Sequence, residues 1–139
     1  MTIEAYLFFE GRCEEAMDFY RHSLGAEMLS LMRYGDSPEA PPPDKLPPGS
    51  QDKVMHGSMR LNGSTLMLSD GLCSGRPSFD GFNLSIGAPD LAGARGMFDA
   101  LSDGGTVRMP LAPTFWSPGF GMVTDRFGVG WMVSVSVSP

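Results

Sequence analysis

The chain has 139 residues, of which 42% are hydrophobic and 19% charged, and this size fits a single domain over 1–139 rather than two independent ones. Sixteen acidic residues outnumber ten basic ones, and the basic residues are scattered, so we expect no nucleic-acid partner. No apolar run approaches the roughly 20 residues that span a bilayer. Residues 1–4 also lack the basic start of a signal peptide, so we expect a cytoplasmic protein without membrane contact.

The first half of the chain predicts one helix among short strands. The apolar run Ile3–Phe9 is too short for a helix and predicts a strand. Apolar residues then recur every three or four positions over Cys13–Leu24, and Gly25 follows, as is typical of an amphipathic helix and its end. Three further strands are predicted at Glu27–Tyr34, Val54–Leu61 and Ser64–Ser69. The last two flank Asn62-Gly63, a strong hairpin signal.

A proline-rich segment, 35–53, interrupts this pattern. It contains six of the twelve prolines of the chain and almost no apolar side chain. Loops of this length inside a compact domain are commonly lids, arms or inserts. We therefore predict a long loop that acts as a lid or as an arm reaching to a second subunit.

The second half repeats the order of elements. Asp90 is placed to cap a helix over Leu91–Leu101. Strands are predicted at Gly81–Ala88, Thr106–Leu111, Gly121–Thr124 and Val129–Val137. Asp125 lies at the tight turn before the last strand, where an aspartate ordinarily caps its own backbone.

The spacing of equivalent positions supports an internal repeat. Phe19 of the first helix precedes the hairpin glycine Gly63 by 44 residues, and Phe98 of the second precedes Gly128 by 30. The 14-residue difference is close to the excess length of the proline-rich loop. We therefore predict two βαβββ units, over 1–70 and 80–139, with one insertion.

Several stretches resemble a known family. Glu15-Ala16, Phe19-Tyr20 and Leu24-Gly25 resemble the first-helix signature of the vicinal oxygen chelate superfamily, which includes glyoxalase I, extradiol dioxygenases and bleomycin-resistance proteins. Three further stretches resemble its PhnB-like branch, also labelled the "3-demethylubiquinone-9 3-methyltransferase" domain family: Met55-His56 through Leu66–Asp70, Phe115-Trp116 with Phe120–Met122, and Thr124–Gly128 with Trp131–Val133. The resemblance implies an α+β fold in which two curved mixed sheets surround a cup.

The resemblance also locates the positions where metal-using members of the superfamily carry His or Glu. They fall on Ala5 or Tyr6, on Met67 or Ser69, on Asn83 or Leu84, and on Met132 beside Trp131. None of these residues is His or Glu, so we expect no metal and no other cofactor. A glycine-rich loop that follows a strand and could hold S-adenosylmethionine is likewise absent, which gives no support to the methyltransferase label.

The sequence is compatible with two functions. The first is a metal-free cup that binds a small organic molecule, as bleomycin-resistance proteins do by sequestration. The residues expected to border it are His56, Met67, Ser69, Asn83, Trp116 and Trp131. The second is an enzyme of lyase, isomerase or dioxygenase type with an unusual site that uses His56 and Asp70. No nucleophile constellation is visible, and the catalytic residues stay unassigned.

We also expect a homodimer. A single βαβββ sheet has one face covered by its helix and the other open, and in this superfamily open faces are commonly completed by pairing units within or between chains. A monomer would leave apolar strand surface exposed, including Ile3–Phe9, which natural proteins avoid. The expected partners are therefore a small-molecule ligand and a second copy of the chain.

Overall fold

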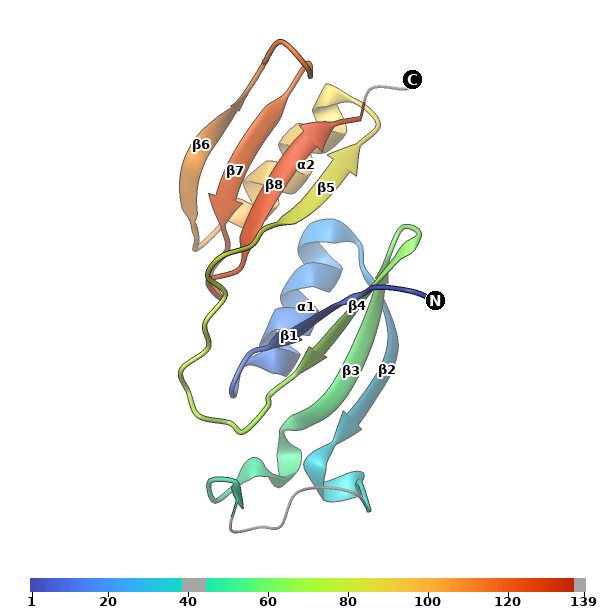
Figure 1. Cartoon of the computed structure of the whole chain (residues 1–139), viewed down its shortest axis with the longest axis vertical. Coiled ribbons are helices and arrows are strands. Elements are labelled where there is room, and N and C mark those ends of the chain that lie inside the picture. Colours follow the sequence, from blue (N-terminus) through green and yellow to red (C-terminus); the bar gives the residue numbers. More distant parts are fainter. Residues whose placement is uncertain (39–44, 137–139) are drawn as a thin grey trace. The chain divides into compact units, whose positions relative to one another are not determined.

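The computed structural model describes residues 1–38 and 45–136, and the chain divides into two compact units (Figure 1). Unit 1 is Met1–Pro77 and unit 2 is Ser78–Pro139. Each unit has one helix and one four-stranded mixed sheet, so the α+β fold predicted from the sequence is confirmed. The predicted end of the last strand, Val137, lies outside the described residues.

Unit 1 follows the predicted order of elements. These are β1 (Ala5–Phe8), α1 (Cys13–Leu24), β2 (Glu27–Arg33), β3 (Val54–Leu61) and β4 (Ser64–Ser69). The sheet order is β1-β4-β3-β2, with β1 parallel to β4 and the other neighbours antiparallel. Short 3-10 turns, Tyr34–Asp36 and Ser50–Asp52, lie at the two ends of the predicted loop.

Unit 2 repeats this topology. Its elements are β5 (Leu84–Ala88), α2 (Leu91–Ser102), β6 (Thr106–Ala112), β7 (Phe120–Thr124) and β8 (Gly130–Val135). The sheet order is β5-β8-β7-β6, and again only the first and last strands pair in parallel. β5 begins three residues later than predicted, and Gly81, at the predicted start, has a φ of 85°, which is not extended backbone.

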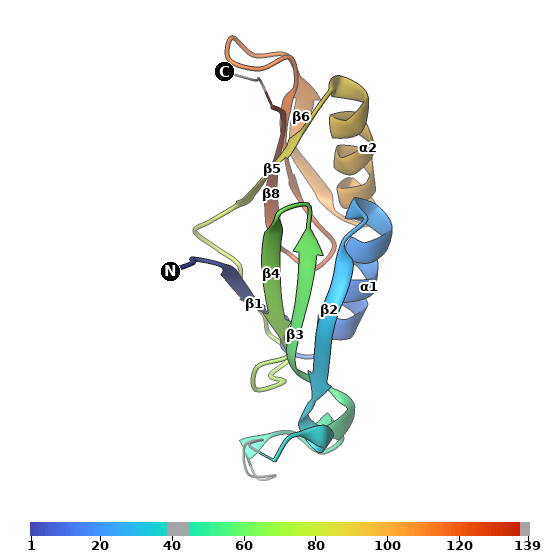
Figure 2. The same ribbon diagram turned by 90° about the vertical axis from the view of Figure 1, so that its right-hand side faces the viewer.

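The core of each unit lies between its helix and one face of its sheet (Figure 2). In unit 1, Met17 and Tyr20 of α1 are fully buried, as are Leu68 and Met59 of the strands beneath them. α1 ends at Gly25, whose φ of 68° is the left-handed conformation of a helix C-cap. In unit 2 the predicted cap is confirmed, because the Asp90 side chain accepts a hydrogen bond from the Gly93 N–H at 2.7 Å.

Strand alternation assigns each side chain to one of two faces, and we call the face turned away from the helix the open face. On the open face of unit 1, exposed or half-buried side chains stand on all four strands. They are Tyr6, Phe8, Ser30, Met32, His56, Ser58 and Met67.

Neither helix is long and apolar enough to cross a membrane, and the same holds for every helix in the described residues.

Candidate functional site

A hydrogen-bonded Tyr6–His56 pair lies on the open face of unit 1. The Tyr6 phenol oxygen and His56 Nδ1 are 3.0 Å apart, and their ring centroids are 5.6 Å apart. Tyr6 comes from β1 and His56 from β3, while β4 runs between them and places Met67 opposite Tyr6. Pairing between strands thus joins two polar side chains that are 50 residues apart in the sequence.

The chemistry of this pair follows from its partial burial. Burial raises the pKa of the Tyr6 phenol, and a hydrogen bond with Ser69 lowers it by less. The phenol therefore stays protonated near neutral pH and can donate a hydrogen bond to His56 Nδ1 when that nitrogen carries no proton. The pair thus places a phenol and an imidazole, which can each donate or accept a hydrogen bond, on the open face.

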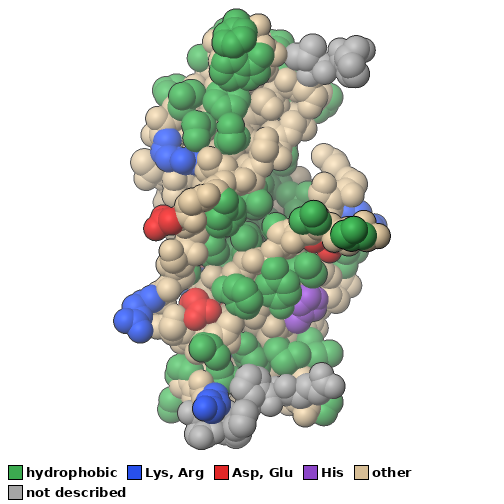
Figure 3. Space-filling view, viewed as in Figure 1, with side chains coloured by type: hydrophobic (Ala, Val, Ile, Leu, Met, Phe, Trp, Pro, Cys, Tyr) green, Lys and Arg blue, Asp and Glu red, His purple; other side chains and the backbone are tan. Residues whose placement is uncertain are grey.

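Apolar side chains surround the Tyr6–His56 pair. Phe8 stacks beside Tyr6 with 5.1 Å between ring centroids and remains 50% exposed. Met32 pairs with His56 across β2 and β3 and is 45% exposed. In the view of Figure 1, which Figure 3 shares, the sheet of unit 1 faces the reader, and hydrophobic side chains gather over that sheet. A few polar groups set in an apolar surface are typical of small-molecule sites.

The two other predicted site residues of unit 1, Met67 and Ser69, differ in their exposure to solvent. Met67 stands half-buried on the open face, between the strands that carry Tyr6 and His56. Ser69 is only 2% exposed, and its hydroxyl accepts a hydrogen bond from the Gly71 N–H at 2.9 Å. Met67 and His56 are therefore available at the surface, whereas Ser69 supports the backbone that follows β4.

Asp70 has a structural role. It is 1% exposed, and its carboxylate accepts three backbone hydrogen bonds of 2.8 Å: Oδ1 from the Gly11 and Cys13 N–H groups, and Oδ2 from the Val54 N–H. Burial, with the nearby Asp70 charge, raises the pKa of the Cys13 thiol, which stays protonated. The described contacts of Asp70 include none with His56, so the structure does not join these two residues as an acid–base or metal site.

In unit 2 the predicted residue Asn83 is joined to an arginine. Asn83 lies directly before β5, and its Oδ1 accepts a hydrogen bond from Arg108 Nη2 at 2.8 Å. The same nitrogen lies 3.4 Å from the Val123 carbonyl oxygen. The arginine crosses the open face above Gly130, because a Cβ at that glycine would lie 2.9 Å from Nη2. Sequence reasoning missed this pair, although a glycine inside a strand signals close approach of another group.

The two tryptophans of unit 2 have different surroundings. Trp116 lies in the β6–β7 connection, is 53% exposed and packs edge-on against Phe115 and Phe120. Trp131 is 3% exposed and stands on the helix-covered face of β8, where its indole N–H donates to Asp125 Oδ2 at 2.9 Å. Trp131 is thus a core residue. The sequence predicted that it borders the cup, because a shift of one residue along a strand moves a side chain to the other face of the sheet.

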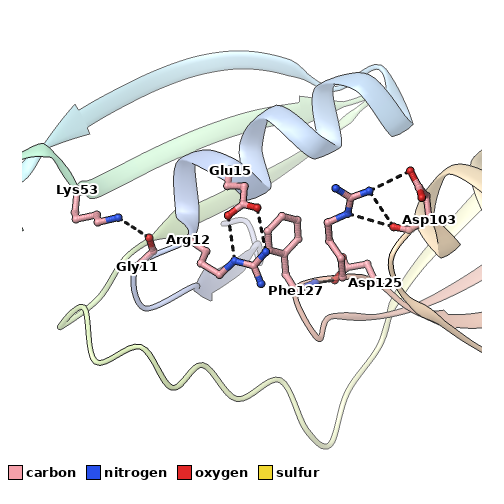
Figure 4. A network of polar contacts seen from close by, with 8 residues as sticks. Gly11, Arg12, Glu15, Lys53, Asp103, Asp125 and Phe127 are labelled. Carbon is pink, nitrogen blue, oxygen red and sulfur yellow. Dashed lines mark hydrogen bonds and ion pairs between the residues drawn. The ribbon is translucent and has the colours of Figure 1, made fainter.

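A charged groove of about 640 Å³ lies beside the start of α1 in unit 1. Its side chains bond to one another and to the backbone: Arg12 to Glu15 at 3.0 Å, Arg33 to Glu14 at 2.7 Å, and Lys53 Nζ to the Gly11 carbonyl at 2.8 Å. Figure 4 shows the first and last of these contacts. Their mutual pairing gives this groove the character of a solvated, ion-paired surface.

The donor set does not fit a metal centre. The superfamily positions are occupied by Ala5, Met67, Leu84 and Met132 or by their neighbours, and these supply no carboxylate or imidazole. Within 1–38 and 45–136, no three His, Cys, Asp or Glu side chains are grouped closely enough to hold a metal ion. We therefore derive no step through a metal.

Comparison with known proteins agrees with this architecture. A solved protein from Pseudomonas aeruginosa, PA1353, is 39% identical, with 98% of each chain covered and a TM-score of 0.84. A structure from Bacillus cereus described as a putative 3-demethylubiquinone-9 3-methyltransferase, PhnB protein, is 28% identical, covers 98% of this chain and 100% of its own, and has a TM-score of 0.79.

Sequence relatives extend the same result. Protein YjdN of Escherichia coli is 36% identical over 97% of this chain and 95% of its own length. The family model described as Glyoxalase/Bleomycin resistance protein/Dioxygenase superfamily matches residues 2–133, which is nearly the whole chain. The chain therefore belongs to the glyoxalase/bleomycin resistance protein/dioxygenase superfamily.

Proposed function

We propose that this protein binds a small organic molecule in a metal-free cup whose wall includes the open face of unit 1. The observation that carries the proposal is the Tyr6–His56 pair, set among the exposed side chains Phe8 and Met32 and the half-buried Met67. Apolar surface supplies affinity for an organic body, while a fixed donor and acceptor orient it. For unit 2 taken by itself, Asn83 and Trp116 remain proposed contacts of a small-molecule ligand.

An enzyme that uses His56 with Asp70 has less support. The family includes dioxygenases as well as resistance proteins, so membership alone does not decide between catalysis and binding. Asp70 is buried, and both of its oxygens already accept backbone hydrogen bonds. A catalytic carboxylate must reach its substrate or metal, which this side chain does not do.

A thermal-shift screen of metabolites and antibiotics on the full chain tests the binding proposal. A ligand at a hundredfold its dissociation constant should add about 2.7 kcal/mol to the free energy of unfolding. We expect Tyr6→Phe and His56→Ala to reduce the shift given by a hit, because each removes one half of the polar pair. His22→Ala is the matched control, since His22 is exposed on α1, away from the open face, and bonds to the Asp18 carbonyl.

Two outcomes would contradict the proposal. One is a hit that stabilises His56→Ala as strongly as the unchanged protein. The other is a near-stoichiometric divalent metal retained by the purified chain, which would favour the enzyme. Metal analysis of the same preparation therefore belongs in the experiment.

The homodimer expected from the sequence is also a proposal. Large apolar side chains stand exposed in unit 2, with Phe115 at 97% and Trp116 at 53%. Such clustered exposure is costly in a monomer, and a biological interface would bury more than about 1,000 Å². We expect sedimentation as a dimer at micromolar concentration, and a shift toward monomer in Phe115→Ser. A monomeric unchanged protein would contradict the dimer.

A further inference from the structure

Arg108 combines two features that no other described arginine shows together: its guanidinium is hydrogen-bonded in place, and it has no acidic partner among the described residues. Six of the eight arginines pair with a carboxylate of Asp or Glu: Arg12, Arg21, Arg33, Arg60, Arg95 and Arg126. For the part of the chain that the structure describes, Arg76 and Arg108 form no such pair. Of these two, only Arg108 is held in place through its guanidinium.

The groups that hold Arg108 are neutral. Asn83 Oδ1 and the Val123 carbonyl oxygen both accept from Nη2, at 2.8 and 3.4 Å. Neutral acceptors fix the plane of a guanidinium but leave its charge uncompensated. Among the described residues, Nε and Nη1 of Arg108 have no hydrogen-bond partner, so their N–H groups remain available for a ligand.

The surroundings of Arg108 favour an anion carried on an apolar body. Arg108 is exposed, so solutes can reach it. Met122 and Met132 are directly paired on β7 and β8 and stand half-buried on the same open face. Thioether side chains adapt to irregular apolar shapes. The face thus combines a fixed cation with an adaptable apolar floor.

The charge balance narrows the class of anion. The other two arginines of unit 2 are paired, Arg95 with Asp99 and Arg126 with Asp103, so Arg108 supplies the one uncompensated guanidinium that the structure describes there. The chain as a whole carries a net charge of −6. A single cation in an acidic protein matches a monoanion better than a dianion such as phosphate.

We infer that the open face of unit 2 is a binding site for a small organic monocarboxylate. Arg108 is its binding residue, Asn83 a positioning residue, and Gly130 the position that leaves room for both. The free N–H groups of a guanidinium donate charge-assisted hydrogen bonds in the plane of the group, which gives a carboxylate direction as well as attraction. The inference concerns unit 2 alone and does not depend on the Tyr6–His56 pair.

Benzoate is the probe that tests this site, with benzamide as its neutral counterpart of the same shape. In side-chain NMR of the full chain, we expect benzoate at millimolar concentration to shift the Arg108 Nε–H signal, and benzamide to leave it in place. In the same titration, Arg108→Gln should weaken benzoate binding at least about tenfold, because it removes a charge-assisted contact. Arg108→Lys should lose part of the affinity, since it keeps the charge without the fork.

Arg76→Gln is the matched control, because it makes the same change in net charge at an arginine that the site does not use. We expect it to bind benzoate as the unchanged protein does. Equal weakening in Arg76→Gln and Arg108→Gln would show a general charge effect and overturn the inference. So would equal binding of benzamide and benzoate, an unmoved Arg108 signal, or tighter binding of inorganic phosphate than of benzoate. The NMR readout uses the unchanged protein and stands even if a variant fails to fold.

Discussion

Replacing Asp70 by alanine is expected to lower the free energy of unfolding by about 4 kcal/mol, because three backbone N–H groups would lose their buried acceptor. These donors belong to the turn before α1, to its first residue, and to the first residue of β3. The carboxylate therefore joins the start of the helix to the sheet. Urea unfolding of the full chain, followed by circular dichroism, measures the loss.

Two further variants separate the hydrogen bonds from the change of residue. Asp70→Asn keeps the shape but offers one acceptor oxygen in place of two, so we expect an intermediate loss of about 2 kcal/mol. Asp80→Ala is the control, since Asp80 is exposed, and its effect should stay within about 0.5 kcal/mol. A loss below about 1 kcal/mol in Asp70→Ala would contradict the structural role assigned to this residue.

Alanine at Gly105 is expected to destabilise the protein by about 3 kcal/mol or more, because the new methyl group would meet backbone rather than a movable side chain. Its Cβ would overlap the Thr124 carbonyl oxygen and lie 3.0 Å from Asp125 Cα. Gly105 directly precedes β6, whose first residue, Thr106, pairs with Thr124. The two strands would have to separate at this end, which should also lower the thermal midpoint.

Gly96→Ala provides a control with the opposite sign. Gly96 lies inside α2, and a Cβ there would have no neighbour within 4 Å. Alanine is the better helix former, so we expect a gain of about 0.5–1 kcal/mol. Equal effects of the two substitutions in the same unfolding experiment would contradict the close approach described for Gly105.

Local patterns predicted the elements well where side-chain spacing and a stop signal coincide. The helix Cys13–Leu24 has its predicted bounds because its apolar spacing ends at a glycine that adopts the left-handed conformation. The hairpin strands of unit 1 also match, since Asn62 takes the required positive φ of 54° at their turn. The cap predicted at Asp125 is confirmed by its bonds from the Phe127 and Val129 N–H groups.

The candidate site was less predictable, because it depends on which strands become neighbours. His56 could be placed on a strand, but its partner Tyr6 comes from a strand two places away in the sheet. Arg108 likewise reaches an asparagine that lies before the opposite edge strand. Trp131 shows why the face of a strand residue is hard to predict, since a shift of one residue moves its side chain between the core and the open face.

The parallel pairing of first and last strands sets the loop-closure entropy of each unit. In unit 1 it joins Ala5 to Leu66, which are 61 residues apart, and in unit 2 it joins Leu84 to Trp131, which are 47 apart. Closure entropy grows only with the logarithm of loop length, so the longer first unit is disfavoured by about 0.2 kcal/mol. The proline-rich segment is therefore nearly neutral for folding thermodynamics, and its length can change between homologues with little effect on stability.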